Sequence, residues 1–138
     1  MRSHTWGRLL LGAAALLHLL PAVAVFSVER AAAAYGIDPG GADLRLLLRH
    51  RGLLFAILGV ALIVAVFRPR LRSAAIGANA VSMAGFVALL PAEGPVGPEL
   101  LRVAAVDAGG LVLLAGAAAL LLRNQRTEGR PVSRPATH

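Results

Sequence analysis

Hydrophobic residues fall into four long runs along the chain, and the polar residues are concentrated between them. The runs cover residues 9–26, 53–67, 74–90 and 103–122, and the third is diluted by Asn79 and Ser82. A helix needs about 20 residues to cross the hydrocarbon core of a bilayer. With their flanks, the runs predict four transmembrane helices, at about 8–26, 46–67, 73–90 and 101–122.

The first run has a second interpretation, as a secretory signal. Arg2 and Arg8 precede the run, and residues 22–24 are Ala-Val-Ala, as at a signal cleavage site. However, the apolar stretch is longer than the core of about 7–15 residues that signals contain, and it carries His18 and Pro21. We therefore interpret it as a retained helix.

Between the first two runs, the chain carries signals for a short helix and a turn. Residues 28–36 (VERAAAAYG) are typical of a short helical extension at the membrane interface that ends at Gly36. The sequence Asp38-Pro39-Gly40-Gly41 then predicts a turn.

The composition agrees with a membrane protein. Of the 138 residues, 57% are hydrophobic and 15% are charged, whereas a soluble domain has about a quarter charged residues. There is no cysteine, which excludes disulfides and thiolate metal sites. All fourteen residues counted as Lys or Arg are arginines, which is typical of a GC-rich bacterial genome.

The distribution of arginines predicts the orientation of the chain. The N-terminal segment, the segment 68–72 and the tail together hold nine arginines and one acid, whereas the other two connections hold five of each. By the positive-inside rule, both termini lie in the cytoplasm and the protein lies in the bacterial cytoplasmic (inner) membrane. The net charge of +7 thus reflects membrane topology, and we expect no nucleic-acid binding, because the arginines form no recognised motif.

These patterns predict an all-α membrane protein, namely an antiparallel four-helix transmembrane bundle with an N-in/C-in orientation. Residues 1–123 form the transmembrane domain. Residues 124–138 lack apolar periodicity and contain two prolines, so we expect a disordered, basic, cytoplasmic tail.

Asp107 is the most informative polar residue of the predicted spans. An aspartate in the middle of a span costs about 2.5–3.5 kcal/mol on insertion scales, so it is expected to have a partner. Arg49 and Arg51 open the second span at a similar depth and are the candidates. The alternatives are a structural ion pair between two helices, a polar site that holds a ligand or relays a proton, or a carboxylate that lies near water.

His18 lies within the first span, three residues before Pro21. Its ring is expected to hydrogen-bond across helices, or to cover the backbone gap that Pro21 leaves, or to transfer a proton. Joint ligation of a haem by His18 and His50 would suit a four-helix bundle, but no attachment motif accompanies the two histidines.

Ionisable residues thus converge on the outer half of the predicted bundle. The candidates for catalysis are His18, His50 and Asp107, and those for binding are Glu29, Arg49 and Arg51. No metal-spaced cluster, phosphate-binding loop or nucleophile elbow is present in the sequence, and we predict no metal site.

A stripe of small residues, Gly52, Ala56 and Gly59, lies along the second span. Small residues allow helices to approach closely in lipid. The stripe therefore predicts tight packing within the bundle or in a homo-oligomer.

The order of several segments resembles a group of small four-span bacterial membrane proteins that has no established activity. The segments are His18-Leu-Leu-Pro21, VERAAAAYGI at 28–37, LRHRGLLFAILGV at 48–60 and a lone aspartate in the last span. Some members carry the label phosphopantetheine adenylyltransferase. That soluble enzyme needs a nucleotide-transfer motif ending in Gly-His on an α/β fold, and neither His18 nor His50 lies in such a motif.

Two classes of function follow from these features. In the first, the bundle is a non-catalytic membrane component, or binds a lipophilic small molecule at the polar site. In the second, the same site belongs to an intramembrane enzyme that isomerises a lipophilic substrate by proton transfer. The lipid bilayer itself is the expected environment in both cases.

Overall fold

The computed structural model describes residues 2–128, and all regular secondary structure within this range is helical. Four of its helical segments are long and apolar enough to cross a membrane, which confirms the predicted number of spans: His4–Val25, Ala42–Phe67, Pro69–Ala92 and Pro98–Leu121. The α-helices are α1 (Arg2–Leu19), α2 (Val28–Tyr35), α3 (Ala42–Phe67), α4 (Arg72–Leu89) and α5 (Pro98–Glu128). Short 3₁₀ segments lie between them: η1 (Pro21–Val25), η2 (Pro69–Leu71) and η3 (Leu90–Ala92).

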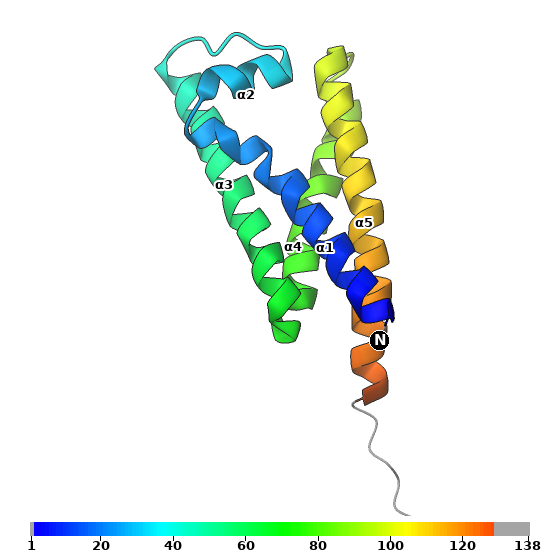
Figure 1. Ribbon diagram of the computed structural model, residues 1–138. Coiled ribbons are helices and arrows are strands. Elements are labelled where there is room, and N and C mark those ends of the chain that lie inside the picture. The colour runs from blue at the N-terminus through cyan, green and yellow to red at the C-terminus, as the bar shows by residue number, and fades with distance from the viewer. Residues whose placement is uncertain (1, 129–138) are drawn as a thin grey trace, which may run out of the picture.

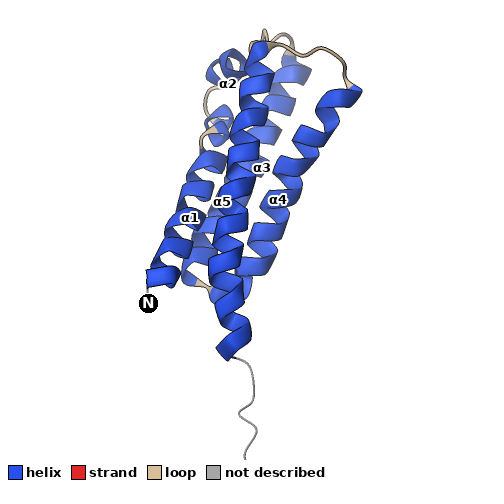
Figure 2. Cartoon of the chain, turned by 90° about the vertical axis from the view of Figure 1, so that its right-hand side faces the viewer, coloured by secondary structure: helices blue, strands red, loops and turns tan. Residues whose placement is uncertain are grey.

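The four long helices run lengthwise beside one another, and α2 lies across one end of them (Figures 1 and 2). The N-terminus and the last turns of α5 lie at the opposite end. We call these the α2 end and the terminal end of the bundle. α5 continues to Glu128, so residues 124–128, which we predicted as the start of a disordered tail, are helical, while residues 129–138 lie outside the described part.

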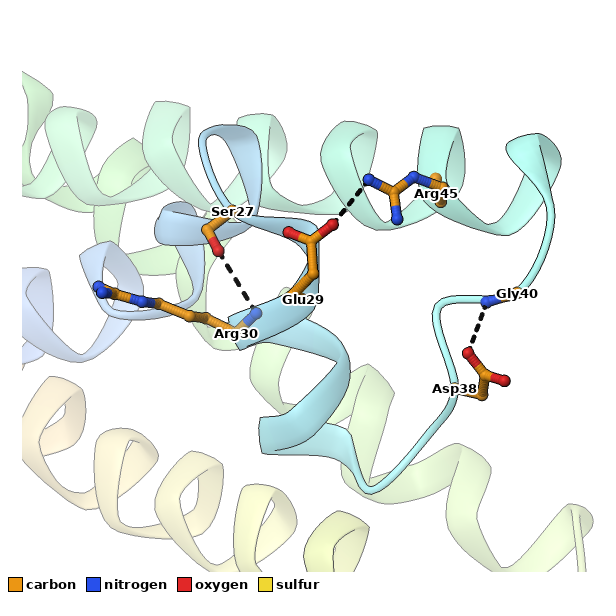
Figure 3. Close-up of polar contacts among 6 residues, drawn as sticks. All are labelled: Ser27, Glu29, Arg30, Asp38, Gly40 and Arg45. Atoms are coloured by element: carbon orange, nitrogen blue, oxygen red, sulfur yellow. Dashed lines mark hydrogen bonds and ion pairs between the residues drawn. The ribbon is translucent and has the colours of Figure 1, made fainter.

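Pro21 divides the first span into two pieces. Because proline lacks an amide hydrogen and clashes with the preceding turn, α1 ends at Leu19 and the chain continues as η1. The chain then turns at Ser27, whose hydroxyl oxygen accepts a hydrogen bond from the amide of Arg30 at 3.5 Å and caps α2 (Figure 3). This break lets α2 fold across the end of the bundle.

The connection from α2 to α3 contains the predicted turn. Gly36 ends α2 with φ of 66°, a conformation that favours glycine, as predicted. The carboxylate of Asp38 accepts a hydrogen bond from the amide of Gly40 at 3.1 Å (Figure 3). α3 begins at Ala42, four residues before the predicted start.

Glycines bring α3 close to the first span. A Cβ added at Gly52 would lie 2.8 Å from the Cβ of Ala24, and one added at Gly59 would lie 2.8 Å from the side chain of Leu19. These two members of the small-residue stripe therefore serve packing within a single chain.

A buried arginine closes the terminal end of α3. Arg72 is 4% exposed, and its Nε and Nη2 donate hydrogen bonds to the carbonyl oxygens of Ala65 and Val66 at 3.2 and 3.3 Å. Carbonyl groups in the last turn of a helix have no helical partner, so Arg72 satisfies them. Side chains such as Leu11, Leu62 and Leu114 form the apolar core of the bundle.

Candidate functional site

A cavity of about 200 Å³ lies beneath α2, where α1 and η1 face α5. Its floor consists of buried side chains from three helices, namely His18 of α1, Met83 of α4 and Asp107 of α5, which are 1, 2 and 9% exposed. Because the first span breaks at Pro21 and α2 folds across the end of the bundle, residues next to the break and residues of α2 line the wall of the cavity. Two of the six candidate residues, His18 and Asp107, thus share one cavity.

The mouth of the cavity is apolar. Leu20 and Val23 from one side and Val106 from the other line it and are 68, 38 and 48% exposed. Because the surrounding helices are apolar enough to span a membrane, these side chains face hydrocarbon in a bilayer. The cavity therefore leads from an apolar surface to a buried polar floor.

Residues of α2 supply the cover. Arg30 and Tyr35 line the cavity together with Ala31 and Ala34, which lie one helical turn apart on one face of α2. We did not identify Arg30 and Tyr35 as site residues from the sequence. The amphipathic pattern of residues 28–36 was the available signal, since it places them on one short helix.

His18 has an imidazole ring without hydrogen bonds. Both ring nitrogens are buried and neither has a hydrogen-bond partner among the described residues. The carbonyl oxygen of Ala14 lies close to the ring, but it meets neither nitrogen in hydrogen-bonding geometry. The ring packs at a tilt of 58° against Phe55 of α3, with centroids 5.6 Å apart. The expected cross-helix hydrogen bond and the covering of the gap at Pro21 are therefore both absent from the described structure.

Asp107 also lacks a direct partner. No hydrogen bond or ion pair reaches its carboxylate from the described residues, so the contact pair with Arg49 or Arg51 that we expected is not formed. Arg51 is close enough to act on the carboxylate electrostatically, whereas Arg49 is exposed on α3. The carboxylate is left available to the cavity that it lines.

Arg51 is surrounded by aromatic rings. The central carbon of its guanidinium lies 5.3 Å from the ring centroid of Tyr35 and 5.2 Å from those of Phe55 and Phe86. Such contacts are attractive because the ring faces carry negative potential. They explain why Arg51 does not extend to Asp107.

Glu29 lies outside the cavity, on the exposed side of α2. Its Oε1 accepts a hydrogen bond from Nη2 of Arg45 at 2.7 Å, an ion pair that ties α2 to α3 (Figure 3). Hydrogen bonds from its own backbone amide and from Arg45 lower the pKa of Glu29. Its role in the structure is to hold the cover helix.

His50 is exposed on α3 and does not line the cavity. The structure therefore does not bring His18 and His50 to a common cavity where both could ligate a haem. Phe55 and Met83, which do line it, were not identified from the sequence, because an apolar residue in an apolar run carries no signal.

Comparison of the chain with protein-family models, curated proteins and solved structures gives no match.

Proposed function

We propose that this multi-pass membrane protein binds a lipophilic small molecule that carries a hydrogen-bonding head group. The observation that carries the proposal is the state of His18, which lines an apolar-mouthed cavity and whose two buried ring nitrogens have no hydrogen-bond partner among the described residues. An unsatisfied buried polar group costs about 1–3 kcal/mol. A ligand hydroxyl at this floor would donate to the carboxylate of Asp107 and, with the His18 ring turned toward the cavity, accept from the imidazole.

The dimensions and walls of the cavity support a ligand with a compact head. An apolar cavity of about 150 Å³ accommodates a benzene ring, so about 200 Å³ accommodates a single substituted ring or a head of that size. The apolar mouth formed by Leu20, Val23 and Val106 provides an exit for a hydrocarbon tail into the bilayer.

In our proposal, the four spans form an antiparallel bundle in the bacterial inner membrane with both termini in the cytoplasm. The arginine distribution supports this orientation. It places the α2 end, and with it the cavity, in the outer half of the membrane. Because the chain has no cysteine, Ser73→Cys and Glu93→Cys each create a single thiol. An impermeant maleimide added to intact cells should label only the Glu93→Cys protein, and the reverse pattern would contradict the orientation.

The binding proposal is tested with two probes that differ by one hydroxyl, 4-hexylphenol and hexylbenzene. The protein is purified in mild detergent, stripped of bound lipid, and titrated with each probe by calorimetry. We expect 4-hexylphenol to bind up to about tenfold more tightly, since a neutral hydrogen bond contributes about 0.5–1.5 kcal/mol.

The variant His18→Leu removes both ring nitrogens and keeps an apolar side chain. It should lose most of the preference for 4-hexylphenol, since only the Asp107 carboxylate then accepts from the hydroxyl, whereas Leu16→Ala, on an exposed face of α1 outside the cavity, should keep the wild-type preference. Equal binding of both probes to the wild type, or no binding of either, would contradict the proposal.

A second candidate function is an intramembrane enzyme that isomerises the bound molecule. It is favoured by the presence of an imidazole and a carboxylate, His18 and Asp107, at the floor of the same cavity. One group would remove a proton from a carbon of the substrate and a protonated group would return a proton to another carbon, so no net charge or redox change results. An isomerised molecule recovered after incubation in D₂O would contain carbon-bound deuterium. If no deuterium is incorporated, the protein binds the molecule without isomerising it.

A further inference from the structure

A second cavity lies between α3 and α4, beside the site just described. Its volume is about 330 Å³, and Leu54 and Leu58 of α3 and Leu89 of α4 form apolar walls. Phe55 lines both cavities and separates the two. We call this second cavity the α3–α4 groove.

Arg51 lies at the end of the α3–α4 groove that is nearer to α2. It makes no hydrogen bond to a described residue, and its Nε is fully buried without a partner. Aromatic rings contact the guanidinium, but rings accept no strong hydrogen bond from its five N–H groups. A membrane-embedded cation in this state requires an acceptor.

The depth of Arg51 matches that of lipid phosphates. It lies sixteen positions before Phe67 at the far end of α3, which corresponds to about 24 Å of helix. The hydrocarbon core is about 30 Å thick, so with Phe67 at one boundary, Arg51 lies about 6 Å from the other. An arginine side chain reaches across such a distance to the headgroup region.

We infer that the α3–α4 groove binds one anionic phospholipid, with its phosphate on the guanidinium of Arg51 and an acyl chain along the leucine walls. Arginine pairs with phosphate through charge-assisted hydrogen bonds, which would satisfy the donors of the two terminal nitrogens. The apolar walls extend about 10 Å from Arg51 to the level of Leu58, which fits a hydrocarbon chain and not a free phosphate ion. This inference does not depend on the ligand proposed for the neighbouring cavity.

Two glycines of α4 provide a matched test. Gly85 lines the α3–α4 groove, and a Cβ added there meets no atom within 4 Å. Gly77 lies on the same helix with the same open surroundings, but it does not line the groove. The variant Gly85→Leu therefore fills the groove without a backbone clash, and Gly77→Leu is its control.

The experiment is native mass spectrometry of the full chain, released from nanodiscs that contain equal amounts of phosphatidylglycerol and phosphatidylcholine. We expect one retained phosphatidylglycerol per wild-type chain, favoured about tenfold over phosphatidylcholine, because the choline cation of phosphatidylcholine is repelled by the guanidinium and no acidic residue among those described lines the groove to bind it. Arg51→Gln should abolish this preference, Gly85→Leu should remove the retained lipid, and Gly77→Leu should behave as the wild type.

Three results would overturn the inference. The first is an equal yield of both lipids from the wild type. The second is retention of phosphatidylglycerol by the Gly85→Leu protein, or an equal loss from Gly77→Leu, which would indicate lipid bound at the general surface. The third is displacement of the lipid by millimolar inorganic phosphate, which would make the phosphate ion alone the ligand. Binding of 4-hexylphenol to Gly85→Leu, measured in parallel, reports separately on the first cavity.

Discussion

The substitution His18→Leu separates a ligand-binding histidine from a structural one by the sign of its effect on stability. A structural histidine holds hydrogen bonds in the folded state, so its loss destabilises the protein. Both ring nitrogens of His18 are buried, and neither has a hydrogen-bond partner in the part of the chain that the structure describes. Replacement by an apolar side chain of similar size should therefore stabilise the ligand-free protein.

The magnitude follows from two opposing contributions. Removing an unsatisfied buried polar group gains about 1–3 kcal/mol, whereas losing the tilted ring contact with Phe55 costs about 0.5–1.5 kcal/mol. We therefore expect His18→Leu to raise the free energy of unfolding by about 1 kcal/mol.

The assay is unfolding by titration with SDS in mixed micelles, followed by far-ultraviolet circular dichroism, on protein stripped of bound lipid. A saturating concentration of 4-hexylphenol should then stabilise the wild type by up to about 1.4 kcal/mol more than it stabilises His18→Leu, because the wild type binds it up to about tenfold more tightly. A ligand-free His18→Leu protein that is less stable than the wild type by 1 kcal/mol or more would refute the reasoning. That result would mean that His18 is hydrogen-bonded within the native chain.

Three further predictions concern the framework of the site. Arg72→Met leaves carbonyl groups of the last α3 turn without donors, so the free energy of unfolding in SDS should fall by about 2 kcal/mol. An unchanged free energy of unfolding would show that these hydrogen bonds do not contribute to stability. Gly52→Ala places a methyl group 3.0 Å from the backbone nitrogen of Val25 and should lower the free energy of unfolding by about 1–3 kcal/mol in the same titration. Gly77→Ala meets open space and should raise it by up to about 1 kcal/mol. Equal effects of the two variants would contradict the close packing of α3 on η1. Hydrogen bonds from its own backbone amide and from Arg45 lower the pKa of Glu29. The ion pair between α2 and α3 should therefore persist above the ordinary pKa of a glutamate and disappear as the pH falls through the lowered value. Hydrogen exchange of the α2 amides should show this acid step in the wild type and lose it in Glu29→Gln, and a step retained in the variant would assign it to another group.

The sequence by itself predicted the spans and the depth of the polar residues within them. Each long apolar run lies in a helical segment long enough to cross a membrane, because a backbone in hydrocarbon has to satisfy its hydrogen bonds within the segment. The rise per residue then predicts both His18 and Asp107 in the half of the spans nearer the α2 end, and the two line one cavity. Depth follows from counting residues, and therefore needs no knowledge of packing.

The tertiary structure decided in which direction each side chain points around its helix. It turned Arg51 toward three aromatic rings instead of toward Asp107, and it left His50 on the exposed face of α3. It also folded α2 across the bundle end, so that Arg30 reached the cavity and Glu29 did not. In a soluble helix, an apolar stripe marks the inner face, but lipid is as apolar as a protein core. A helix that is apolar on all sides carries no such mark, so its rotation is settled only by close contacts with its neighbours, such as those at Gly52.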